Sequence, residues 1–124
     1  MKFVPVDPPR AFTVGAGIRL KDCGRIRLEA DEQVTFTTDA GGEYDVVRKP
    51  WGFYATPSLN GRLPDFGLRA VLVKSAASRF HVLLVERGEE PAFQEYLKKA
   101  ALTIVTWLDS DGSLTALEQV SRRE

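Results

Sequence analysis

Two apolar runs decide the fold of this chain: LRAVLV at residues 68–73 and FHVLLV at residues 80–85. Both are apolar on each side of a strand over most of their length, which is typical of central strands whose two faces are covered. Residues 74–79 join the two runs as a hairpin. The sequence therefore predicts a well-covered antiparallel pair, and another element must cover its second face.

The next segment can supply that cover. Residues 89–91 place two carboxylates and a proline where a helix begins, and Lys98 and Lys99 lie where cations complement the end of the helix dipole. The apolar stripe of this helix consists of Phe93, Tyr96, Leu97 and Ala100. Residues 102–108 follow as another two-sided strand. After them Ser113 can cap a short C-terminal helix, with a final strand as the alternative.

The N-terminal half alternates more clearly between apolar and polar residues. Residues 25–30 and 34–37 show the alternation of half-covered antiparallel strands, with Ile26 and Leu28 on the inner side, and turn residues separate these strands and a third one from Tyr44 onward. The predicted fold class is a strand-rich α+β domain. We expect one curved or partly closed antiparallel sheet, barrel-like or sandwich-like, with about five to seven strands and one packed amphipathic helix.

Length and charge set the domain organisation and exclude several partners. The 124 residues form a single domain, with an extended proline-rich arm at 1–10 and a frayed tail at 121–124. Lys plus Arg and Asp plus Glu both count 17, so no net charge attracts nucleic acid. No run is long and apolar enough for a membrane span, and a single cysteine excludes an internal disulfide. We expect a cytoplasmic protein with neither nucleic-acid nor membrane partners.

The densest group of aromatic and polar residues lies at 51–62, and it is the candidate binding loop. Its aromatic side chains can wall a pocket, its hydroxyl and amide groups can donate adaptable hydrogen bonds, and its guanidinium offers a planar fork to a carboxylate or phosphate. The candidate ligand-binding residues are Trp51, Phe53, Tyr54, Ser58, Asn60 and Arg62.

A purely structural interpretation of the same loop competes with this one. In it the aromatic side chains fill the core, Pro57 starts a turn, and Asn60 and Gly61 form a corner with positive φ. Arg62 then pairs with Asp45 or Asp65. The two interpretations can coexist, since a rigid turn also presents polar groups well.

Catalytic signals are sparse. His81 is the only histidine and Cys23 the only cysteine, which is poor material for a metal site, and we expect neither a metal nor another cofactor. His81 remains the candidate general base of a cofactor-independent isomerase or hydrolase. The preferred hypothesis is a small binding or accessory module that holds a small anionic or sugar-like ligand, or a protein partner, through residues 51–62. A third hypothesis is an obligate homodimer, because the two-sided strands can exceed what one helix covers.

Overall fold

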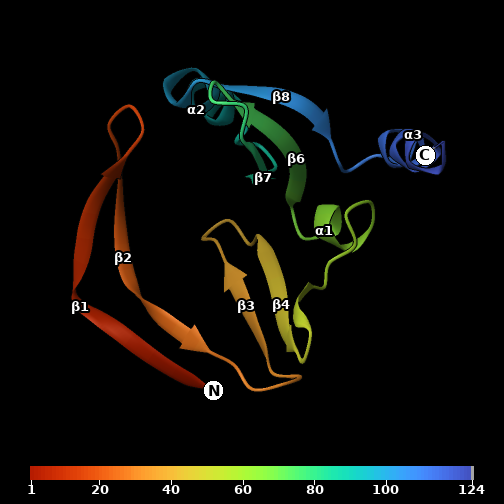
Figure 1. The fold of residues 1–124 in the computed structure, drawn as a ribbon. Coiled ribbons are helices and arrows are strands. Elements are labelled where there is room, and N and C mark those ends of the chain that lie inside the picture. The colour runs from red at the N-terminus through yellow and green to blue at the C-terminus, as the bar shows by residue number, and fades with distance from the viewer. Residues whose placement is uncertain (124) are drawn as a thin grey trace. The chain divides into compact units, whose positions relative to one another are not determined.

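A computed structural model of the chain describes residues 1–123, and it is mixed α+β and rich in strands (Figure 1). The strands are β1 (Lys2–Val14), β2 (Ile18–Arg27), β3 (Gln33–Thr37), β4 (Glu43–Lys49), β5 (Gly52–Ala55), β6 (Leu68–Ser75), β7 (Phe80–Glu86) and β8 (Leu102–Trp107). The helices are α1 (Arg62–Asp65), α2 (Glu90–Ala100) and α3 (Asp111–Arg122). The predicted fold class is therefore confirmed.

The strands belong to three antiparallel sheets and not to one curved sheet. Their orders are β1-β2, β3-β4-β5 and β7-β6-β8, and across residues 1–123 these sheets do not close into a barrel. Residues 1–123 contain eight strands, more than the five to seven expected, and β1 (Lys2–Val14) includes most of the residues predicted as an extended arm. Pairing of β1 with β2 shifts between Pro5 and Arg10, where the prolines lack the N–H groups that a regular ladder needs.

Contacts divide the chain into two compact units. The first unit contains Met1–Thr35 and Asp45–Thr56, and the second contains Phe36–Tyr44 and the chain from Pro57 onward. Strands β3 and β4 each have residues in both units. Of the residues described, every buried hydrophobic one belongs to the second unit, so the apolar core of the protein lies there. The single-domain organisation stays a prediction.

The core of the second unit forms where α2 covers one face of the sheet β7-β6-β8. Phe93 and Leu97, one turn apart on α2, pack against Val71 and Val73 of β6, as the helical stripe predicted. Trp107 of β8 packs against this core, and its ring centroid lies 5.9 Å from that of Phe93 in an edge-to-face arrangement. A second cluster contains Leu63 of α1 with residues of β6.

Arg69 ties the elements of this unit together. Its guanidinium lies 3.9 Å from the centroid of the Trp107 ring, and its Nε atom donates to Oδ2 of Asp109 at 2.6 Å. An ion pair of 4.0 Å joins it to Glu90 at the start of α2. The Arg69 side chain thus links β6 to Asp109, which follows β8, and to Glu90 of α2.

The C-terminal helix exists, but its cap is not Ser113. Ser110 is the N-cap, and its Oγ accepts from the backbone N–H of Ser113 at 3.1 Å, so that Asp111 and Gly112 lie inside the helix. An N-cap side chain normally accepts from the backbone N–H two or three residues further along, as Ser110 does from Ser113. Ser121 and Arg122, in the predicted frayed tail, continue α3, while Glu124 lies outside the described residues.

Candidate functional site

The aromatic residues of the predicted loop lie on the β4–β5 hairpin of the first unit, and all are exposed. Trp51, Phe53 and Tyr54 have 71%, 64% and 52% of their surfaces exposed, so they do not fill a core. In the hairpin register Phe53 lies opposite Arg48, and Tyr54 lies opposite Val47. Since successive strand residues point to opposite faces, the side chains of Phe53 and Tyr54 leave the hairpin on different faces.

The polar residues of the predicted loop lie in the second unit, in the turn that leads into α1. Ser58 Oγ accepts from the backbone N–H of Arg62 at 2.8 Å, and Asn60 Nδ2 donates to Asp111 Oδ1 at 2.7 Å. The Arg62 guanidinium lies 5.4 Å from the centroid of the Phe66 ring. These contacts hold a turn in place, as in the structural interpretation. The corner itself differs, because Gly61 has φ of −136° and needs no positive φ.

His81, the candidate general base, is exposed on β7, an edge strand of its sheet. It lies opposite Val73 in the ladder, and no hydrogen bond or ion pair between residues 1–123 involves its imidazole. A general base is normally oriented by a second polar group. The role of His81 as a general base in the enzymatic alternative stays a prediction.

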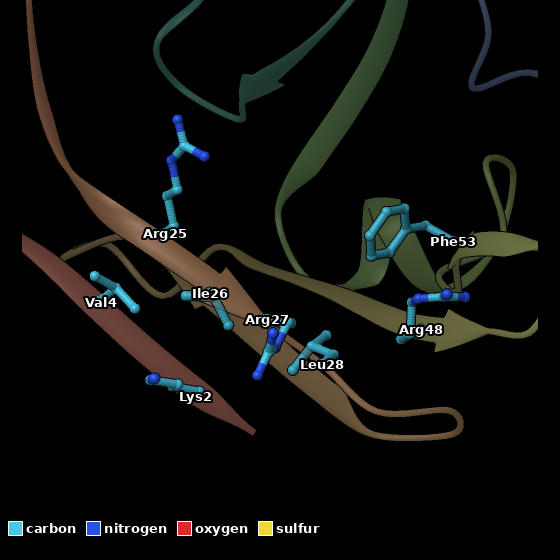
Figure 2. Close-up of a pocket in the computed structure, with 8 residues that line it drawn as sticks. All are labelled: Lys2, Val4, Arg25, Ile26, Arg27, Leu28, Arg48 and Phe53. Atoms are coloured by element: carbon cyan, nitrogen blue, oxygen red, sulfur yellow. The ribbon is translucent and has the colours of Figure 1, made fainter.

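A pocket in the first unit brings together residues that are far apart in the sequence. Its volume is about 380 Å³, which lies at the lower end of the range of small-molecule sites. The lining consists of four cationic and four apolar residues: Lys2, Val4, Arg25, Ile26, Arg27, Leu28, Arg48 and Phe53. No acidic side chain contributes to this lining. We call it the basic pocket (Figure 2).

The β1–β2 ladder explains part of this concentration of charge. Lys2 lies directly opposite Arg27, and Val4 lies opposite Arg25. Directly opposed like charges on an antiparallel pair are destabilising, so Lys2 and Arg27 repel each other across the ladder. Figure 2 shows Arg25 extending from β2 in a direction different from that of Lys2, which places it at the rim.

The opposite wall comes from the β4–β5 hairpin. Arg48 Nη1 donates to the backbone carbonyl oxygen of Gly52 at 3.3 Å, and its guanidinium lies 5.8 Å from the centroid of the Phe53 ring. These two contacts hold the Arg48 side chain beside Phe53. An exposed aromatic ring and a positioned guanidinium therefore lie on the same face of this hairpin.

Nearby carboxylates do not neutralise the pocket. Asp31 pairs with Lys49, and Glu32 pairs with the amino group of Met1 at 2.9 Å. The backbone N–H of Glu29 donates to Glu32 at 2.7 Å, and this bond, followed by the Met1 amino group, holds the pKa of Glu32 below its usual value. Of the ion pairs between residues 1–123, none involves Lys2, Arg25 or Arg27.

Of the residues that line the basic pocket, only Phe53 is among the ligand-binding residues predicted from the sequence. The alternating pattern at 25–30 correctly placed the arginines on the outer side, but it also placed Ile26 inside, whereas 45% of Ile26 is exposed. The alternating pattern did not predict that β2 pairs with residues 2–5, because those residues were expected to form an extended arm. The cationic cluster is thus a product of strand register.

The side chains that commonly bind metal ions are not clustered in the described part of the chain. No group of three or more His, Cys, Asp and Glu residues in it is placed to hold a metal ion. The Cys23 thiol is exposed and lies 3.8 Å from the carbonyl oxygen of Lys21. The helices between residues 1 and 123 are all too short or too polar to cross a membrane.

The fold and the pocket together define the class of this protein: a strand-rich α+β chain of two compact units, with a basic pocket in the first. Comparisons with models of protein families, with curated proteins and with solved structures gave no match. The function proposed below therefore rests on the chemistry of the pocket.

Proposed function

We propose that this chain is a small binding module and that its basic pocket holds a small anionic ligand. The observation that supports this is a set of cations around one cavity with no carboxylate among the lining residues. Lys2 and Arg27 are directly opposed, which costs free energy in the absence of an anion. A bound carboxylate or phosphate would turn that repulsion into two charge-assisted hydrogen bonds.

The proposal narrows the ligand class expected from residues 51–62. Four cations favour an anion over a neutral sugar, and only Phe53 of the predicted loop contributes to the pocket. Binding at Trp51, Tyr54, Ser58, Asn60 and Arg62 stays a prediction. We also propose a cytoplasmic location, because a single thiol cannot form an internal disulfide.

Calorimetric titration with inorganic pyrophosphate tests this function. Wild type should bind, and Arg27→Gln should weaken binding by about 10-fold or more, since a hydrogen bond to a charged group contributes roughly 1.5–3 kcal/mol. The same substitution should leave the unliganded protein as stable or more stable, by up to about 1 kcal/mol, because it removes the repulsion with Lys2.

A matched control is Arg79→Gln, which removes an exposed arginine of the β6–β7 turn in the second unit. It should leave the affinity for pyrophosphate unchanged. Equal binding by wild type and Arg27→Gln, or no binding by wild type, would show that the basic pocket is not an anion site.

A second candidate function is a homodimeric structural domain, and one observation favours it. Helix α2 covers one face of the sheet β7-β6-β8, while Phe80, Val82 and Val105 of the same sheet are 58%, 59% and 49% exposed. Monomers rarely leave neighbouring large apolar residues uncovered. A second copy of the chain would bury this surface, and the molar mass in solution tests the idea.

A further inference from the structure

We propose that the anion held in the basic pocket carries an aromatic ring, and that its natural class is a nucleoside diphosphate or triphosphate. This inference rests on the proposed anion-binding function and adds to it the chemistry of the rest of the ligand. The carrying observation is that half of the lining is apolar and includes an exposed phenylalanine beside a positioned arginine.

The apolar half of the pocket is not needed to bind a bare phosphate. Val4, Ile26 and Leu28 contribute no hydrogen bonds from their side chains, yet they lie beside the cations in the same cavity. Apolar surface stabilises a complex only when the ligand also has apolar surface to remove from water. The ligand therefore has a charged end and a weakly hydrated end.

Phe53 indicates what the weakly hydrated end is. Its ring is 64% exposed, lines the cavity, and has the Arg48 guanidinium 5.8 Å from its centroid. A flat ring with a neighbouring guanidinium forms a stacking platform for a nucleobase, which gains from both π-stacking and the cation. An aliphatic carboxylate has no ring that could stack on Phe53.

The cations and the volume of the basic pocket indicate what the charged end of the ligand is. Lys2 and Arg27 face each other across the ladder, with Arg25 at the rim, so two or three negative charges can be paired at once. A volume of about 380 Å³ suits one nucleotide and is small for a long oligonucleotide. Because the lining side chains are only cationic or apolar, they read the base by stacking, and purines should bind more tightly than pyrimidines.

The test compares ADP, CDP and inorganic pyrophosphate by calorimetric titration of the full chain, without divalent cations. Wild type should bind ADP at least about 10-fold more tightly than pyrophosphate, with CDP between them, given the usual contribution of one stacked base. Phe53→Leu keeps an apolar side chain but removes the ring, so in this variant the affinity for ADP should fall to within about threefold of the affinity for pyrophosphate.

Phe36→Leu is the control, because Phe36 is an exposed strand phenylalanine outside the pocket. It should keep the preference for ADP. If pyrophosphate binds and ADP binds no more tightly, or if Phe53→Leu keeps the preference, the nucleotide inference is overturned while anion binding stands. If neither compound binds, the proposed function itself fails.

Discussion

Gly24 lies where the surrounding atoms leave little room for a side chain. It has φ of +151°, and a Cβ atom built on it would lie 2.6 Å from the carbonyl oxygen of Val4 and 2.8 Å from the Phe3 ring. Gly24 lies opposite Pro5 on β1, so the ring of Phe3 packs over a position without a side chain. The close approach of β1 to β2 beside the basic pocket depends on this glycine.

We expect Gly24→Ala to destabilise the protein by about 1–3 kcal/mol, because it adds both backbone strain and a clash with the β1 backbone. Urea denaturation followed by circular dichroism measures the change. Gly112→Ala is the matched control, since no atom lies within 4 Å of its Cβ position and it lies inside α3. The control should be neutral or slightly stabilising. Equal stability of wild type and Gly24→Ala would contradict the packing described here.

At the scale of elements, α2 covers one face of the sheet β7-β6-β8, whereas the other face is covered near Ala70 by Leu63 of α1 and is exposed at Phe80 and Val82. The Val71 and Val73 side chains point to the face covered by α2, whereas Leu72 of the same strand and Val82, its partner on β7, belong to the other face. Helix α3 has no buried residue, and its Leu117 and Val120 line a pocket together with Val105 of β8. The apolar run at 80–85 predicted a central strand with two covered faces, but β7 is an edge strand on which Phe80 and Val82 are exposed.

If the exposed part of the second face, at Phe80 and Val82, is a dimer interface, Val82→Lys should convert a dimer to a monomer without changing the circular dichroism spectrum. The reason is that a lysine on an exposed edge strand prevents apolar and edge-to-edge association. Size-exclusion chromatography with light scattering at micromolar concentration gives the mass. Val14→Lys, at an exposed position at the end of β1, is the control and should remain dimeric. A monomeric wild type would exclude the second candidate function.

At the scale of the whole molecule, each compact unit contains one tryptophan. Trp51 lies in the first unit and Trp107 in the second. The first unit has no buried hydrophobic residue of its own among those described, and it shares β3 and β4 with the second. A unit without an apolar core has little hydrophobic burial to stabilise it alone.

We therefore expect the two units to unfold together. Trp107→Phe leaves Trp51 as the reporter of the first unit, and Trp51→Phe leaves Trp107 as the reporter of the second. Urea transitions followed by fluorescence anisotropy should have the same midpoint in both variants, after correction for each variant's stability measured by circular dichroism. A first-unit transition that is complete before the second begins would show two separately folding domains, and the single-domain prediction would be wrong.

Much of the fold could be predicted because its elements carry local signals. The strands at 68–75 and 80–86 follow from continuous apolar runs, and α2 follows from the carboxylates and proline at its start and from Phe93 and Leu97 four residues apart. Residues 1–10 were harder to predict, since their prolines weaken the strand signal and their partner lies elsewhere in the chain. Local propensity cannot supply a partner strand.

The sequence by itself determined the α+β class and the sheet with its covering helix. Only the tertiary structure decided the candidate site. Lys2, Arg27 and Arg48 are distant in the sequence, and strand register within the first unit makes them line one pocket with Phe53. The physical reason is that charge repulsion and ring stacking act through space, so their effects depend on which strands pair, and single-strand patterns do not contain that information.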